Sequence, residues 1–243
     1  MRCTLAFASK VGEYQAAFRA MVLDVGGRAI QPRGLCVSTM TLLFELSHPL
    51  PAIAPTQHDL DVQTSTRFTN QCSVKGVAGG SRFCVKMFRN GKLHVTGARS
   101  LAAGIAIVRD VCEKLFPRTR PVLADFDVEM LNLVFHVGTA LLLTGLQAEA
   151  RAAGLVSTYC PARYPGLRVV TPWGTLLVFG SGSVLVTGCR GPDAAARCTA
   201  TMLRLILPRH VASADSTRAR KRRRERADSL MDNVYGAVVR ATV

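Results

Sequence analysis

The chain has 243 residues, 49% of them hydrophobic, which is enough to bury one substantial core and excludes an intrinsically disordered protein. Lys and Arg number 31 against 16 Asp and Glu, and the resulting formal net charge of +15 favours polyanionic partners. The longest apolar run is interrupted by Asn132, His136 and Gly138 and falls short of the roughly 20 apolar residues of a membrane helix. We therefore expect a soluble chain without a membrane partner.

Cysteine and histidine spacing bears on metal binding and on compartment. None of the eight cysteines forms a Cys-x-x-Cys pair, and no two histidines stand at ligand spacing, which argues against a zinc site. The N-terminal MRCTLAFAS is too short for the core of a signal peptide. The cysteines are therefore expected to be reduced thiols of an intracellular protein.

The first predicted element is an amphipathic helix over residues 11–23, in an N-terminal extension (1–34) for which the sequence suggests no function. Beyond this extension the chain aligns with itself at an offset of 91 residues. GKLHVTG, which ends at Gly97, matches GSVLVTG, which ends at Gly188, and a phenylalanine stands three residues before each opening glycine. The chain is thus an imperfect tandem duplication.

Each copy predicts the same succession of elements. A strand is followed by a variable stretch with room for a short helix, then by two strands, a tight turn, another strand and a long helix. In the first copy the strands are expected at 37–46, near 67–75, at 82–88 and up to Thr96, with GVAGG as a hairpin tip. The expected fold class is α+β, a tandem duplicated antiparallel sheet with helices on one side.

The copies divide the chain into four segments. We expect a first repeat at 35–120, a second at 121–207 and a basic C-terminal tail at 208–243. The arginine-rich RARKRRRERADSL in the tail suggests a nuclear address or nonspecific affinity for nucleic acid, or simply a solvated basic end.

Side chains of a strand alternate between its two faces, so the faces can be read separately. One face of 82–88 is apolar, whereas the other places Phe88 beside the cations Arg82 and Lys86. A sheet face that combines threonines, aliphatic side chains and aromatic rings suits the floor of a DNA minor groove, where shape and apolar wedges replace a hydrogen-bond code.

The two copies resemble the TATA-box-binding protein family. They read FRNGKLHVTGA and FGSGSVLVTGC where the family has Phe-x-Ser-Gly-Lys-x-x-x-Thr-Gly-Ala, and YPGL stands where it has Phe-Pro-Gly-Leu. DFDVEMLNLV also resembles the opening of the family's second half, so the resemblance covers residues 35–207. It implies a saddle of ten strands with its concave face on the DNA minor groove, four helices on the convex face, and neither enzymatic activity nor a cofactor.

The resemblance also implies DNA-binding residues. In the family two aromatic residues per half wedge between base pairs, a known property that would assign Phe68 and Phe88 in the first copy and Tyr164 and Phe179 in the second. The other matching positions are Thr96 and Thr187 for groove-contacting threonines, His94 and Leu185 where the family has valine, and Leu177 and Lys86 where it has leucine.

Two departures concern the floor of the groove. Lys86 suits an apolar floor poorly, although its side chain can reach a phosphate. The family places an asparagine in the first strand of each half to bond the central base edges, whereas the matching stretches here offer Thr39 or Thr41 and Asn132, the last shifted by two residues. The sequence therefore does not predict selectivity for a TATA-like sequence.

The favoured function is a TBP-like DNA-binding protein that bends promoter DNA for transcription initiation. Its partners would be double-stranded DNA and general transcription factors or the RNA polymerase machinery, bound by a monomer with pseudo-twofold symmetry. It would act in the nucleus or in a viral replication compartment, since an Ala/Arg/Gly-rich divergent chain resembles both the relatives in large DNA viruses and a cellular paralogue.

Two other classes of function were weighed. A sequence-nonspecific nucleic-acid-binding or protein-interaction module would share the fold. An enzyme is not expected, because Asp125, Asp127 and Glu129 share a strand face without a partner motif and no phosphate-binding loop is present.

Overall fold

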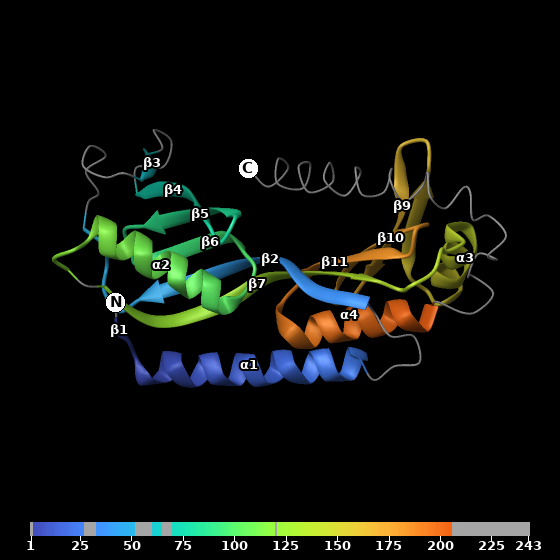
Figure 1. Cartoon of the computed structure of the whole chain (residues 1–243), viewed down its shortest axis with the longest axis horizontal. Coiled ribbons are helices and arrows are strands. Elements are labelled where there is room, and N and C mark those ends of the chain that lie inside the picture. The colour runs from blue at the N-terminus through green and yellow to red at the C-terminus, as the bar shows by residue number, and fades with distance from the viewer. Residues whose placement is uncertain (1, 27–32, 52–59, 65–69, 120, 206–243) are drawn as a thin grey trace.

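The computed structural model describes residues 2–26, 33–51, 60–64, 70–119 and 121–205 (Figure 1). These residues form four α-helices, α1 (Leu5–Gly26), α2 (Leu101–Leu115), α3 (Leu143–Ala152) and α4 (Gly191–Leu205). They also form eleven strands, β1 (Arg2–Cys3), β2 (Arg33–Leu46), β3 (Asp61–Thr64), β4 (Gln71–Ala78), β5 (Ser81–Phe88), β6 (Lys92–Ala98), β7 (Val122–His136), β8 (Val156–Cys160), β9 (Tyr164–Thr171), β10 (Gly174–Phe179) and β11 (Ser183–Cys189). No helix in these ranges is both long and apolar enough to cross a bilayer.

All the described strands join one sheet in the order β3-β4-β5-β6-β2-β7-β11-β10-β9-β8, with β1 added to β7. Every pairing is antiparallel except that of β1 with β7. The long strands β2 and β7 open the two copies and pair with each other at the centre of the sheet, with Met40 opposite Leu131. The sheet is therefore continuous across the duplication, and we call the part from β2 to α2 the first half and the part from β7 to α4 the second half.

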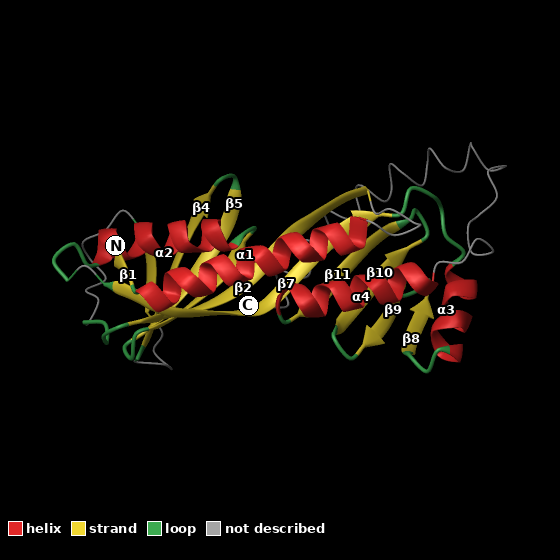
Figure 2. Ribbon diagram, turned by 90° about the horizontal axis from the view of Figure 1, so that it is seen from below, coloured by secondary structure: helices red, strands yellow, loops and turns green. Residues whose placement is uncertain are grey.

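The alternation predicted for the strands is confirmed. In β5, Phe83, Val85 and Met87 are buried, whereas Arg82 is exposed and Phe88 is half-buried. The buried face packs against the helices, and α2 approaches it so closely that a Cβ on Gly104 would clash with Cδ1 of Leu42. The predicted antiparallel sheet with helices along one side is thus observed (Figure 2).

The sequence motif that occurs in both copies begins with the same tight turn, which joins β5 to β6 in the first half and β10 to β11 in the second. Gly91 and Gly182 adopt positive φ values of 87° and 96°, a region that glycine enters without strain. Their backbone N–H groups donate to the carbonyls of Phe88 and Phe179 at 3.0 and 2.9 Å. The shared sequence therefore fixes where each predicted wedge residue stands relative to its turn.

Several predicted boundaries shift. The strand expected near 67–75 begins at Gln71, and the turn at Gly79 and Gly80 confirms the hairpin tip. The short helix expected in the variable stretch is α3 in the second half, whereas the corresponding stretch of the first half lies mostly outside the described residues.

The N-terminal helix is longer than predicted and belongs to the body of the fold. Phe7 is buried and packs edge-on against Phe126 at 5.4 Å between ring centroids, and Thr4 continues the pairing of β1 by donating its N–H to the carbonyl of Leu123. The far part of α1 runs beside α4 (Figures 1 and 2). The helix therefore bridges the first element of the second half, β7, and its last, α4.

Candidate nucleic-acid interface

The sheet face opposite α2 and α4, which we call the open face, collects the side chains that the sequence assigned to DNA binding. On the first half it carries Lys86, Phe88, His94 and Thr96, all half-buried. Adjacent strands bring these residues together, because Lys86 of β5 is opposite His94 of β6. His94 and Thr96 alternate along β6 with the buried Leu93 and Val95, which face the helices. The side chains of His94 and Thr96 therefore point away from the helices.

An aromatic pair stands where the hairpin of β9 and β10 meets the turn at Gly182. The rings of Tyr164 and Phe179 meet edge to face, 5.9 Å apart with an interplanar angle of 62°. Gly166 makes room for both rings, since a Cβ there would lie 2.7 Å from Tyr164 and 3.1 Å from Phe179. The two predicted wedge residues of the second half are thus adjacent and held by packing.

The Tyr164 ring is partly withdrawn from water. Burial raises the pKa of its hydroxyl, and the oxygen is buried with no hydrogen-bond partner among the described residues. The phenol is therefore neutral at physiological pH and presents a mainly apolar ring.

The corresponding aromatic pair of the first half is described only in part. Phe88 ends β5 and remains half-buried beside Gln71, its partner in β4. Phe68, the other predicted wedge, lies outside the described residues.

Threonines lie at the middle of the sheet, as the sequence predicted. Thr41 of β2 pairs with Thr96 of β6 on one side and with Met130 of β7 on the other. Thr39 pairs with Asn132, and Thr187 of β11 is half-buried. Thr41 is 7% exposed and Thr39 is half-buried.

Asn132 has a structural contact that its sequence position did not reveal. Its side chain is 3% exposed, and its amide oxygen accepts the backbone N–H of Gly188 at 3.0 Å. Gly188 lies in a register shift of β11 between Val186 and Cys189, where a ladder hydrogen bond is missing. The amide oxygen of Asn132 is therefore already used by the protein backbone.

The two halves present different floors on the open face. In the first half, Nε2 of His94 lies 3.0 Å from Oε2 of Glu129, an ion-pair geometry that joins β6 to β7 across β2. In the second half, Leu185 stands at the position of His94 and is 6% exposed, and Leu177 stands at the position of Lys86 and is half-buried. The second floor is apolar and the first is polar.

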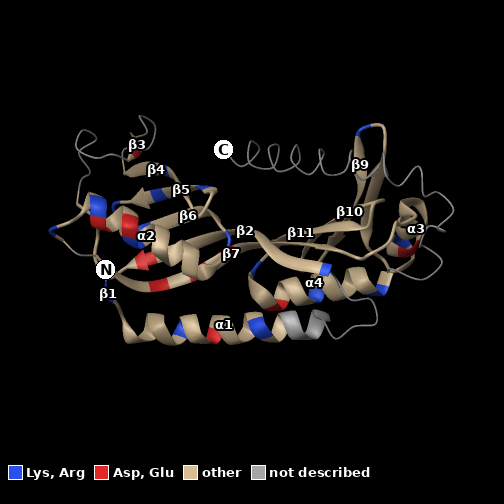
Figure 3. Ribbon diagram, in the orientation of Figure 1, with Lys and Arg blue, Asp and Glu red and all other residues tan. Residues whose placement is uncertain are grey.

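Two of the acids of β7 make side-chain contacts that the sequence did not indicate. Glu129 meets His94, and Asp125 accepts a hydrogen bond from Nζ of Lys10 at 2.8 Å, which lowers the pKa of the Asp125 carboxyl. Both partners lie far away in sequence, one of them on α1. Figure 3 shows the acids of β2 and β7 on the side of the molecule where α2 lies, while basic residues occur on both sides.

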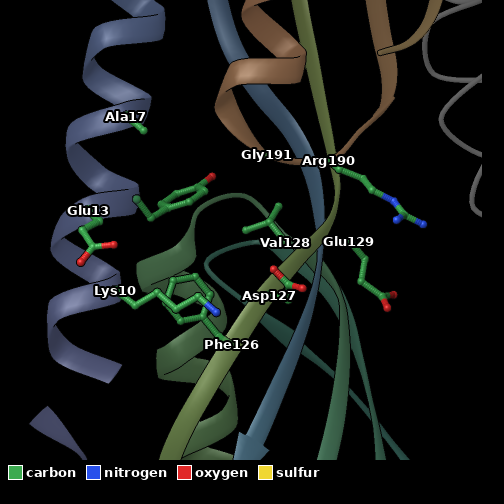
Figure 4. Close-up of a pocket in the computed structure, with 10 residues that line it drawn as sticks. Lys10, Glu13, Ala17, Phe126, Asp127, Val128, Glu129, Arg190 and Gly191 are labelled. Carbon is green, nitrogen blue, oxygen red and sulfur yellow. The ribbon is translucent and has the colours of Figure 1, made fainter. Parts of the chain in front are cut away.

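A cleft of about 450 Å³ separates α1 from β7 near the start of α4 (Figure 4). It is lined by Lys10, Glu13, Tyr14, Ala17, Phe126, Asp127, Val128, Glu129, Arg190 and Gly191. Burial raises the pKa of Tyr14 to about 12, so its phenol is neutral under ordinary conditions. Within the described ranges no group of histidines, cysteines and carboxylates is arranged to hold a metal ion.

Comparison with known proteins places this geometry in context. Residues 125–208 match the family model described as "Transcription factor TFIID (or TATA-binding protein, TBP)". The match therefore covers the second half and not the first.

Similar proteins are named TATA-box-binding protein. The TATA-box-binding protein of Methanosphaera stadtmanae is 34% identical over 112 residues, which are 45% of this chain and 60% of that protein. The TATA-box-binding protein of Methanothermobacter thermautotrophicus is 33% identical over 110 residues, 44% of this chain and 59% of that protein. The aligned region thus spans about three fifths of each relative.

The fold matches over a longer stretch than the sequence does. The solved structure of Methanococcus jannaschii TBP superposes with a TM-score of 0.59, covering 70% of this chain and 97% of that one at 16% identity. This likeness confirms the saddle architecture that the sequence resemblance implied.

Proposed function

Because the chain is a divergent relative of the TATA-box-binding proteins, we propose that it is a DNA-binding transcription factor that holds duplex DNA on the open face and bends it through the minor groove. The observation that carries this proposal is the aromatic pair Tyr164 and Phe179, which stands at the edge of an apolar floor with the helices on the other side of the sheet. Flat rings at that position can enter between base pairs.

Charge supplies the affinity in this proposal. The chain carries a formal net charge of +15, so phosphate neutralisation and counterion release favour binding to any duplex. The deformability of the site then supplies the selectivity, because bending is easier at flexible steps.

One observation favours a second candidate function, a sequence-tolerant nucleic-acid-binding module with the same fold. Asn132 is 3% exposed and its amide oxygen is bonded to the backbone N–H of Gly188, which holds the side chain against β11 and limits its reach toward a base edge. With hydroxyls at Thr39 and Thr41 as the remaining central groups, the open face has little means of reading base edges.

The partners and the place of action follow from the proposal. A promoter-bending factor presents its helix layer to general transcription factors or to the RNA polymerase machinery, and it acts as a monomer inside the compartment where the DNA is transcribed. The viral origin considered from the composition stays a prediction.

The test is a binding and bending assay on short duplexes labelled with a fluorescence donor and acceptor at their ends. AT-rich, TATA-containing and GC-rich duplexes are compared over a salt series, with Phe88→Ala/Phe179→Ala beside the unmodified chain. We expect the unmodified chain to bend AT-rich duplexes selectively and the double variant to bind more weakly without bending.

Two results distinguish the alternatives. Equal bending of all duplexes would favour the sequence-tolerant module. Equal binding that disappears with salt and ignores both substitutions would mean that the open face is not the DNA site.

A further inference from the structure

Three positions of the open face differ in chemistry between the two halves. At the offset of 91 residues, Lys86 corresponds to Leu177, His94 to Leu185 and Glu129 to Ser38. Ser38 is 9% exposed and its hydroxyl donates to the backbone carbonyl of Asn132 at 3.3 Å. The leucines Leu177 and Leu185 of the second half thus correspond to Lys86 and His94 of the first half, and β7 contributes the Glu129 carboxylate beside His94 where β2 has only the satisfied hydroxyl of Ser38.

The carboxylate of Glu129 reaches the open face from a β-bulge. The register of β2 with β7 shifts between Thr41, opposite Met130, and Leu42, opposite Val128, so Glu129 is the extra residue. Its side chain points away from α1 (Figure 4) and meets the ring of His94 across the intervening strand β2. The Glu129 side chain is 48% exposed and that of His94 is 27% exposed.

This arrangement opposes entry of the first half into a minor groove. The groove floor presents acceptors, N3 of adenine and O2 of thymine, and an ionised carboxylate is itself only an acceptor. Stripping water from the Glu129 and His94 pair would also carry the desolvation penalty of charged and polar groups. The corresponding floor of the second half, with Leu177 and Leu185, has neither obstacle.

We propose that the chain engages DNA asymmetrically: the second half enters the minor groove and unstacks bases with Tyr164 and Phe179, while the first half stays outside the groove and contacts phosphates through Arg82 and Lys86. The proposal rests on the proposed function and deepens it by naming which half inserts. Glu129 and His94 are the residues that determine this difference.

The experiment places 2-aminopurine, whose fluorescence rises on unstacking, at both ends of an AT-rich site and compares Phe88→Ala with Phe179→Ala. We expect Phe179→Ala to abolish the fluorescence rise and to weaken binding about tenfold, in the range measured for lost base–aromatic stacking. Phe88→Ala should change either quantity by no more than about twofold, since a ring outside the groove makes no stack. Phe179→Leu, which keeps the apolar volume but not the planar ring, should behave like Phe179→Ala if the alanine variant folds poorly.

A triple variant tests whether these three side chains keep the first half out of the groove. Lys86→Leu/His94→Leu/Glu129→Ser replaces each of them by the residue at the corresponding position of the other copy, and we call the result the transplanted floor. In this background Phe88→Ala is expected to lower the fluorescence rise and the affinity as Phe179→Ala does in the unmodified chain. Asp193→Asn on α4 is the control for the loss of the Glu129 carboxylate alone, because it removes one carboxylate 79% exposed on the helix layer and should leave the Phe88 effect absent.

The outcomes separate this inference from the proposed function. Equal losses from Phe88→Ala and Phe179→Ala in the unmodified chain would overturn the asymmetry and leave minor-groove binding intact. A transplanted floor without any new dependence on Phe88 would overturn the role of His94 and Glu129. Absence of unstacking in every variant would overturn both the inference and the proposed function.

Discussion

The side chain of Asn132 bonds to the protein backbone, and the family resemblance also assigns it to a base edge. Its oxygen satisfies the N–H of Gly188 at a bulge, and the residue is 3% exposed. A buried backbone donor that loses its partner costs about 1–3 kcal/mol. The bulge of β11 therefore depends on this side chain, whatever its amide N–H groups contribute to DNA.

We predict that Asn132→Ala lowers the free energy of unfolding by about 1–3 kcal/mol. Asn90→Ala is the control, because Asn90 makes the same kind of bond, accepting the N–H of Lys92 at 3.2 Å, at an exposed turn. Water replaces that bond, so the loss should be about 0.5 kcal/mol or less. Denaturant unfolding of both variants measures the difference, and equal losses would contradict the structural role of Asn132.

Gly182 combines a positive φ with a close approach. A Cβ at this position would clash with the carbonyl oxygen of Thr139 and lie 3.1 Å from the ring of His136. Gly154 has a φ of +74° with nothing within 4 Å, so it isolates the backbone effect.

Gly182→Ala is expected to destabilise the chain by about 3 kcal/mol or more, and Gly154→Ala by about 1–2 kcal/mol. Thermal and denaturant unfolding of the two variants give the comparison. If the two losses were the same, the clash with Thr139 would be relieved by a small shift of the loop.

At the scale of elements, α1 is the part of the fold that the sequence did not explain. The rings of Tyr14 and Phe126 meet at 6.2 Å, and the buried Tyr14 hydroxyl has no partner in the described part of the chain. Burial raises the pKa of this hydroxyl to about 12 from its ordinary value of 10.0. A phenol that is harder to ionise in the folded state than in the unfolded state makes stability fall as pH rises through that interval.

Tyr14→Phe should therefore lose less stability than the unmodified chain between pH 10 and pH 12. A single such group contributes a slope of at most about 1.4 kcal/mol per pH unit. At pH 7 the variant should lie within about 1 kcal/mol of the unmodified chain, because no hydrogen bond is lost. Urea unfolding along a pH series measures this, and parallel curves would show that Tyr14 ionises as easily in the folded state as in the unfolded one.

Buried thiols act in the same direction, so both proteins will weaken at alkaline pH. Burial raises the pKa of Cys72 to about 11 and that of Cys112 to about 12. The difference between the two curves, and not the fall itself, reports on Tyr14.

The sequence predicted the turns and strand faces of the two copies and the presence of the N-terminal helix, but not how that helix packs. Two copies of one phrase located the turns at Gly91 and Gly182, and alternation identified the two faces of β5 and β6. The docking of α1 could not be predicted, because its contacts with Asp125 and Phe126 join segments more than a hundred residues apart. The contact of Glu129 with His94 was equally hidden, since it depends on a one-residue register shift.

At the scale of the whole molecule, charge and shape have separate roles. Nine Lys and Arg against four Asp and Glu follow Leu207, outside the described residues, whereas the aromatic pair belongs to the sheet. Phosphate contacts set the salt dependence of binding, and inserted rings set the bend.

Removing residues 208–243 should weaken DNA binding at low salt and leave the bend angle unchanged. The slope of log K against log salt concentration should fall by about 0.9 for each phosphate contact that the tail makes. A variant with glutamine at the seven basic positions of 218–226 controls for chain length. An unchanged slope would show that the tail makes no phosphate contacts, and a lost bend would place it in the bending machinery.

The contact of α1 with α4 also has a consequence for biosynthesis. Helix α1 packs against α4, which is synthesised some 170 residues after it. At a synthesis rate of about 5–20 residues per second, α4 is made on the order of ten seconds or more after α1, and only then can the two helices pack. The described part of the fold is thus complete only after α4 has been synthesised. A nascent chain stopped before α4 would lack the helix against which α1 packs.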